Sequence, residues 1–237
     1  MSSFLHVLLL SSLLLAAASS SQAKVESGLL SSSDVDVSDF PAPPAEGSLE
    51  DETDLNLVRF RQKERTDDLC KIADEQAHMN LNFIFGSPRG PLTDVEIDQV
   101  RDLMAQVAAD AGYFNLILKK KYNRPRPFMR DSEITACVTH SPEASYPSGH
   151  SVVSRLMGLI LSDLYPSKKK AILEQTDSIA DSRVLGGVHH PKDTEAGQQL
   201  GNLIFKAYLK NNFYKKCEAD ISVCNSIGQA KVKDANY

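Results

Sequence analysis

The chain has 237 residues, 42% of them hydrophobic and 24% charged, which suffices for one globular domain with a buried core and leaves little room for a second. The formal net charge is −5, and neither sign forms a long block. This balance gives no reason to expect a nucleic-acid partner.

The first segment, residues 1–23, is typical of a secretory signal peptide. An apolar stretch runs from Phe4 to Ala18, and the small residues that follow suit cleavage before Lys24. No Lys or Arg precedes this stretch, and the alternative is an uncleaved membrane anchor. The stretch is short for a membrane span, so we expect cleavage and secretion into the periplasm or the extracellular space. No later segment is apolar enough to predict a stable membrane association.

Residues 24–53, KVESGLLSSSDVDVSDFPAPPAEGSLEDET, are rich in Ser, Pro, Asp and Glu and poor in aromatic residues. A segment of this composition does not bury enough apolar surface to offset the entropy lost on ordering. We therefore predict a flexible acidic leader that acts as a spacer.

After the leader, every patterned segment is helical. Residues 54–85 carry apolar residues at helical spacing with one or two breaks. Thr93 and Glu96 form a capping-box signature at the start of a long helix. That helix must stop near Arg124, because the prolines around it cannot continue a helix.

Three more helical patterns follow, over residues 152–165, 168–187 and 193–213, and no stretch alternates like a β-strand. The predicted fold class is therefore all-α, a compact helical bundle. We expect the helical domain to cover residues 54–216 and a tail to cover residues 217–237.

The four cysteines are Cys70, Cys137, Cys217 and Cys224. In a secreted chain an even count favours disulfides, and four cysteines allow three pairings. Cys217 with Cys224 would close a short loop in the tail, and Cys70 would then pair with Cys137. A zinc site is the alternative, but the sequence contains no CxxC pair.

Three polar clusters interrupt the helices: KKKYNRPRPF (119–128), PSGH (147–150) and SRVLGGVHHPKD (182–193). Taken alone, the first is an ordinary solvated helix end, the second a turn with an N-cap serine, and the third a surface loop. Together they combine cations, histidines and a helix start. Arginine and lysine match phosphate oxygens, and the free amides of a helix N-terminus bind anions. The clusters therefore predict a site for an oxyanion.

The order and spacing of these clusters, K-x6-R-P, P-S-G-H and S-R-x5-H-x3-D, resemble the signature of the phosphatidic acid phosphatase type 2 and vanadium haloperoxidase superfamily. Within it the chain looks most like the secreted class A non-specific acid phosphatases, through FGSP, RPF, SYPSGH and SRVLGGVHH. The resemblance covers roughly residues 60–213. It implies an all-α acid phosphatase that needs no metal or other cofactor.

Spacing selects one lysine and one arginine in the first cluster. Only Lys119 stands seven residues before an Arg-Pro pair, which begins at Arg126. We therefore expect Lys120, Lys121 and Arg124 to be solvated.

Spacing also selects one histidine in the third cluster. His189, and not His190, lies six residues after Arg183 and four before Asp193. We expect His190 to be a neighbour without a chemical role and His140 to be a surface loop residue.

The resemblance implies a phosphomonoesterase of broad specificity with an acidic pH optimum, acting on small-molecule phosphate monoesters. His189 would form a phosphohistidine, with Asp193 accepting a hydrogen bond from its other ring nitrogen. His150 would act as general acid and then as general base. The residues implied to bind the substrate phosphate are Lys119, Arg126, Ser148, Gly149 and Arg183.

Two other functions remain open from the sequence. A vanadium-dependent haloperoxidase would place vanadate in the same site, although such chains are generally longer. A catalytically dead phosphate-binding protein is the second, although it would not need the residues His150, His189 and Asp193. The resemblance also implies self-association as a homo-oligomer.

Overall fold

The computed structural model describes residues 28–226. The predicted signal peptide and residues 227–237 lie outside the described residues. Within them the chain is helical, and the one extended pairing recorded there is an isolated bridge between Gly86 and Leu92. The helices are α1 (Leu49–Lys63), α2 (Asp67–Ala77), α3 (Leu81–Phe85), α4 (Asp94–Tyr122), α5 (Pro127–Arg130), α6 (Gly149–Leu164), η1 (Pro166–Lys168), α7 (Lys169–Leu185), α8 (Pro191–Tyr208), α9 (Asn212–Ala219) and η2 (Ile221–Asn225).

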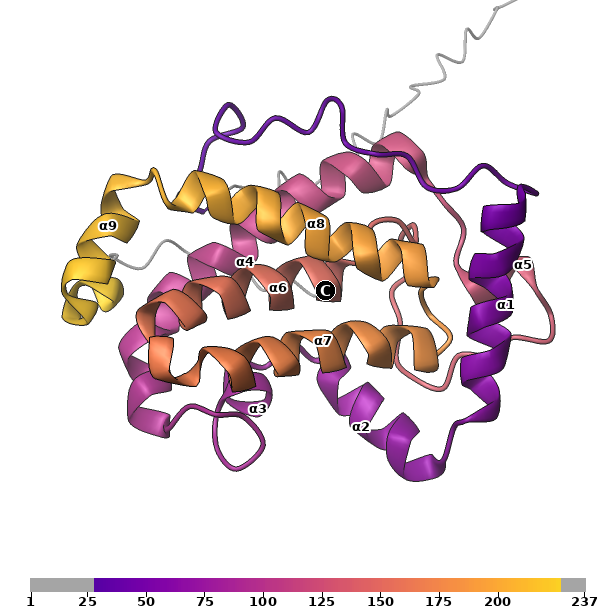
Figure 1. Ribbon diagram of the computed structural model, residues 1–237, viewed down its shortest axis with the longest axis horizontal. Coiled ribbons are helices and arrows are strands. Elements are labelled where there is room, and N and C mark those ends of the chain that lie inside the picture. The colour runs from indigo at the N-terminus through magenta and orange to yellow at the C-terminus, as the bar shows by residue number, and fades with distance from the viewer. Residues whose placement is uncertain (1–27, 227–237) are drawn as a thin grey trace, which may run out of the picture.

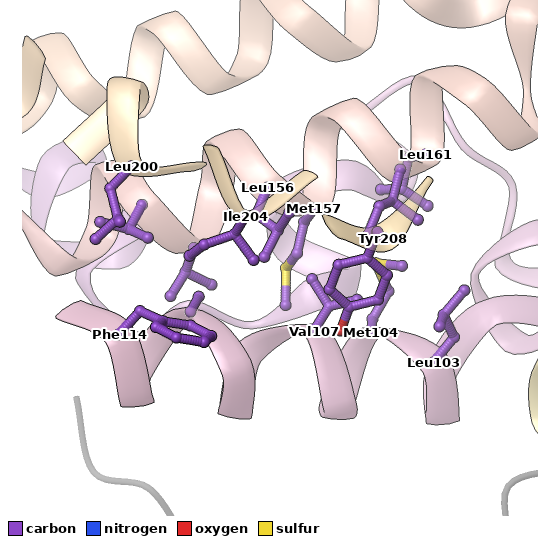
Figure 2. Packing of buried hydrophobic residues seen from close by; sticks show 14 of the residues in the cluster. Leu103, Met104, Val107, Phe114, Leu156, Met157, Leu161, Leu200, Ile204 and Tyr208 are labelled. Atoms are coloured by element: carbon purple, nitrogen blue, oxygen red, sulfur yellow. The ribbon is translucent and has the colours of Figure 1, made fainter. Parts of the chain in front are cut away.

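The predicted all-α class is confirmed by this architecture (Figure 1). Helix α6 lies at the centre of the bundle and packs against α4, α7 and α8. Its sequence is apolar on most sides, which is the pattern of a helix enclosed by neighbours. The core side chains that meet between α4, α6 and α8 are shown in Figure 2: Leu103, Met104, Val107, Phe114, Leu156, Met157, Leu161, Leu200, Ile204 and Tyr208.

The long helix α4 begins and ends where the sequence predicted. At its start the Thr93 side chain accepts a hydrogen bond from the Glu96 amide, and the Glu96 carboxylate accepts one from the Thr93 amide, which is the predicted capping box. Its last residue is Tyr122, and Asn123 ends the helix in the left-handed conformation with φ 44°.

The prediction of a flexible leader is wrong for residues 28–53. Residues 28–48 form an ordered strap that runs across the bundle (Figure 1), and its side chains Leu30, Val35 and Phe40 are buried in the main core. Helix α1 begins at Leu49, capped by the Ser48 side chain. The composition of the segment is polar on average, but a few well-spaced apolar residues are enough to anchor it.

A buried carboxylate also holds the strap. Asp110 on α4 accepts hydrogen bonds from the amides of Gly28 (2.6 Å) and Leu29 (3.0 Å), and from the Tyr208 hydroxyl (2.6 Å). Burial nevertheless raises the pKa of Asp110, because these hydrogen bonds offset only part of the desolvation cost. The polar partner of the strap therefore lies in the core, about 80 residues further along the chain.

One of the two expected disulfides is present. Cys70 on α2 is bonded to Cys137 with a Cα–Cα distance of 5.8 Å, which ties α2 to the loop before α6. The predicted Cys217–Cys224 bond is wrong, because both residues are free thiols. They are buried in the main core, where a thiol packs as a small apolar side chain.

No helix among residues 28–226 is both long enough and apolar enough to cross a bilayer. The domain limits predicted from the sequence need two changes. The ordered helical unit includes the strap and α1 from Leu49, and it extends through α9 and η2, whose Cys217 and Cys224 are buried in the main core.

Candidate active site

A cavity of about 390 Å³ opens among the ends of α2, α6 and α7 and the loop at residues 139–143. Six of the eight predicted site residues line it. Ser148 and Asp193 are fully buried and do not belong to the lining. The six lining residues are Lys119, Arg126, Gly149, His150, Arg183 and His189.

The start of α6 presents free amides at this cavity. The Ser148 side chain caps the helix by accepting a hydrogen bond from the Ser151 amide, and the Ser148 amide donates to the Asp193 carbonyl (2.9 Å). The amides of Gly149 and His150, the first two of the helix, have no acceptor among the described residues. The helix N-terminus therefore keeps two donors for a bound anion.

Three buried cations surround the cavity, and each is held by a backbone carbonyl. Lys119 Nζ donates to the Ala144 carbonyl, and Arg183 Nη2 donates to the Ala73 carbonyl. Arg126 Nη1 donates to the Val188 carbonyl (2.8 Å). Carbonyls orient these side chains without neutralising them.

No carboxylate of residues 28–226 forms an ion pair with any of the three cations. Burial and the nearby charge of Arg126 lower the pKa of Lys119 to about 8. Burial lowers the pKa of Arg183 to about 10, and its Nη1 atom is buried without a hydrogen-bond partner in the described part of the chain. The site thus gathers positive charge that an anion would stabilise.

His189 is oriented by a different partner at each ring nitrogen. Arg126 Nη1 lies 3.2 Å from Nε2, and the Ser145 hydroxyl lies 3.3 Å from Nδ1. An arginine N–H only donates, so Nε2 carries the lone pair and Nδ1 the hydrogen. Burial and the Arg126 charge hold the pKa of His189 well below its ordinary value. A neutral ring with a lone pair at the cavity can act as a nucleophile.

Asp193 lies next to the Nδ1 side of His189, and its carboxylate accepts several hydrogen bonds. Its Oδ2 is 3.6 Å from His189 Nδ1 and accepts a hydrogen bond from the Ser145 hydroxyl (2.6 Å). His190 adds two more, from its amide and from Nδ1, each at 2.8 Å. Burial alone would raise the pKa of Asp193, but its interactions with the two histidines and with Arg124 hold that pKa well below its usual range. Asp193 therefore stays ionised.

His190, expected to be a neighbour without a chemical role, has a structural role at the site. The ring is fully buried and does not line the cavity, but it holds Asp193 in place. Arg130 Nη1 lies 3.1 Å from His190 Nε2. Because arginine only donates, His190 accepts at Nε2 and donates from Nδ1 to Asp193.

The expectation that Arg124 is solvated is also wrong. Its side chain is 5% exposed and forms ion pairs with Asp193 (2.7 Å), Asp51 (2.8 Å) and Asp54 (2.8 Å). Asp51 in turn accepts from Arg130 (2.5 Å). These contacts close a ring of side chains in the order Asp193, His190, Arg130, Asp51 and Arg124.

The ring links α1 to the site, and nothing local in the sequence indicates it. Asp51 and Arg124 are 73 residues apart in the sequence. The expectations for Lys120, Lys121 and His140 are confirmed, since all three are exposed. His140 also stacks on Phe128, with ring centroids 4.5 Å apart, and lines the cavity.

His150 projects from the first turn of α6 into the cavity. Its Nε2 lies 2.9 Å from the Ala77 carbonyl at the end of α2, so that nitrogen carries a hydrogen. Burial and the Arg183 charge lower the pKa of His150 to about 3. The ring is therefore neutral in the ligand-free protein from weakly acidic pH upwards.

Comparison with known proteins identifies a family and relatives of this chain. Residues 102–217 match the PAP2 superfamily. The chain is 30% identical over 169 residues to a non-specific acid phosphatase of Providencia stuartii, covering 67% of this chain and 68% of that protein. It is 29% identical over 168 residues to a non-specific acid phosphatase of Salmonella typhimurium, covering 59% and 67%.

The chain belongs to the PAP2 superfamily. Within it the chain is a phosphatase related to the non-specific acid phosphatases, as the resemblance in the sequence predicted.

Solved structures show the same fold. A transmembrane PAP2-type phosphatidylglycerolphosphate phosphatase from Bacillus subtilis matches with a TM-score of 0.53 and 21% identity, over 72% of this chain and 89% of that one. A bacterial vanadium-dependent iodoperoxidase matches with a TM-score of 0.55 and 19% identity, over 73% and 52%. At these identities the likeness concerns the fold alone.

Proposed function

We propose that this protein is a secreted acid phosphatase of broad specificity that hydrolyses phosphate monoesters through a phosphohistidine. The observation that carries the proposal is the set of three buried cations around His189 that have no carboxylate partner among residues 28–226. Phosphoryl transfer depends mainly on positioning and on stabilising the charge of the phosphoryl oxygens. Lys119, Arg126 and Arg183 supply that charge, and the amides of Gly149 and His150 add hydrogen bonds.

In the first step the lone pair on His189 Nε2 attacks phosphorus. The N–P bond forms while the bond from phosphorus to the ester oxygen breaks, and His150 donates a proton to the departing oxygen. The imidazolium that develops keeps its Nδ1 hydrogen, which Asp193 stabilises directly or through the Ser145 hydroxyl.

In the second step a water molecule attacks phosphorus and gives a proton to His150. The N–P bond breaks, the electron pair returns to Nε2 of His189, and inorganic phosphate leaves. The scheme requires no metal ion.

The proton on His150 requires a bound substrate. In the empty site its pKa is about 3, and a phosphate group beside the ring opposes the effect of the cations and raises that pKa. A monoester that binds as the monoanion also brings its own proton. Both effects favour activity in acid, which supports the proposed acidic optimum.

Export rests on two features. Residues 1–23 have the pattern of a signal peptide, and the Cys70–Cys137 disulfide suits an oxidising compartment.

The test is hydrolysis of p-nitrophenyl phosphate across pH by the chain from Lys24 onwards, produced in an oxidising compartment, with EDTA present. We expect metal-independent turnover that His189→Ala abolishes, and an acid-labile phosphoprotein after rapid quenching of the wild type. A folded wild-type protein without turnover would contradict the proposal. Adding vanadate, bromide and peroxide to the same sample would then show whether it is a haloperoxidase.

A further inference from the structure

Asn115 is a buried polar residue of the cavity that the sequence motifs do not include. It lies on α4 and lines the cavity, with 6% of its surface exposed. Its Oδ1 is buried and has no hydrogen-bond partner, and no hydrogen bond joins its side chain to the residues that the structure describes. A buried carboxamide without partners is unusual, because each polar atom removed from water normally finds a partner in the protein.

The energetic cost of such a residue points to a ligand. A carboxamide buried without hydrogen bonds destabilises the fold, whereas an apolar side chain of the same shape would stabilise it. Functional sites are where proteins keep such groups. Arg183 also lines the cavity, and its Nη1 atom is buried without a hydrogen-bond partner among the described residues. A phosphoryl oxygen accepts hydrogen bonds, so it is a candidate partner for Arg183 Nη1 and for Asn115 Nδ2, and not for Asn115 Oδ1.

The position of the carboxamide identifies the ligand's chemistry. Asn115 precedes Lys119 by four residues, which places both on the same face of α4. Its Nδ2 lies 3.1 Å from the position that a Cβ on Gly149 would occupy. The donor end of the carboxamide is therefore beside the first residue of α6, where two helix amides are free.

We propose that Asn115 is a further phosphate-binding residue, whose Nδ2–H donates a hydrogen bond to a phosphoryl oxygen of the bound monoester. The inference rests on the proposed function, because it places the phosphoryl group at the start of α6. It extends that site by a neutral donor, which adds a hydrogen bond without adding to the repulsion among the three cations. It also explains why α4 carries a polar residue at a position that packs against Gly149.

The test compares phosphate binding with stability in two variants of similar shape. Asn115→Leu removes the donor, and Asn115→Asp replaces it by an acceptor that repels phosphate. Isothermal titration with inorganic phosphate should show about tenfold weaker binding for Asn115→Leu, and weaker binding still for Asn115→Asp, since hydrogen bonds to charged groups are among the strong ones. Urea unfolding should show that Asn115→Leu is at least as stable as the wild type.

Ser162→Ala is the matched control. The Ser162 hydroxyl is also buried without a partner among the residues that the structure describes, near the far end of α6 and away from the cavity. This variant should keep the wild-type affinity for phosphate. A residue with a merely structural role would instead lose stability on substitution and leave phosphate affinity unchanged.

The outcomes separate this inference from the proposed function. Phosphate binding by Asn115→Leu or Asn115→Asp within twofold of the wild type would overturn the role of Asn115. A wild type that binds phosphate but does not hydrolyse monoesters would overturn the proposed function and leave the binding comparison intact. A wild type that does not bind phosphate would overturn both.

Discussion

Asp51→Asn tests the ring of side chains that connects α1 to the site. The Asp51 carboxylate is 1% exposed and is paired with Arg124 and Arg130. Burial opposes its ionisation, but the hydrogen bonds from Arg130 and Arg124 outweigh burial and lower the pKa of Asp51 from 3.8 to about 2. At about 1.4 kcal/mol for each pKa unit, ionised Asp51 contributes about 2 kcal/mol to the free energy of unfolding near neutral pH.

The pH dependence follows from the sign of that shift. A carboxyl whose pKa is depressed by folding stabilises the protein above its unfolded pKa, and the contribution is lost as the pH falls through the folded value. For Asp51 the window runs from 3.8 down to about 2. At about pH 3, roughly half of the contribution remains.

Urea unfolding of the wild type and Asp51→Asn at about pH 7 and about pH 3 checks the prediction. We expect a loss of about 2 kcal/mol at the higher pH and about half of that at the lower pH. Asp39→Asn, at an exposed position of the strap, is the control and should change stability by less than about 0.5 kcal/mol. An equal loss for Asp51→Asn at both pH values would refute the electrostatic argument, because packing alone does not depend on pH.

Two further predictions concern the disulfide and the site histidine. Replacing Cys70 and Cys137 by serine opens a loop of 67 residues, and chain entropy predicts that the free energy of unfolding falls by about 4 kcal/mol. Urea unfolding of the double variant measures this loss of stability. A loss below about 1 kcal/mol would contradict the prediction. His150 has its pKa lowered to about 3 by burial and by Arg183, with smaller contributions from Arg126 and Lys119. Below its ordinary value of about 6.5 the unfolded chain therefore binds more protons than the folded one, and the stability of the ligand-free protein should fall as the pH decreases from there. Melting temperatures with and without phosphate should show that phosphate recovers part of this loss, and a loss that phosphate leaves unchanged would contradict the argument.

Six of the motif residues line one cavity, and the sequence could single them out because their spacing is local. Lys119 and Arg126 lie in one cluster, seven residues apart, and His189 and Asp193 lie in another, four residues apart. Both predicted ends of α4 are confirmed, because a capping residue or a proline determines the backbone conformation only of the few residues next to it. Helix ends and short motifs can therefore be predicted from the sequence.

The residues that were missed depend on contacts between distant segments. Arg124 is basic and next to two exposed lysines, so its sequence context is that of a solvated side chain. It is buried only because α1 brings Asp51 and Asp54 to it. For His190, spacing identified the neighbouring histidine but could not show that both rings reach the same carboxylate.

The strap has a consequence for the order in which the chain can fold. It is the first described segment, yet its amides bind Asp110, which lies 82 residues after Gly28, and its Leu29 carbonyl accepts from Asn211, at a separation of 182 residues. During synthesis the strap leaves the ribosome before either partner has emerged. Its docking surface is complete only after residue 211 has been made, so this early segment must be among the last to settle.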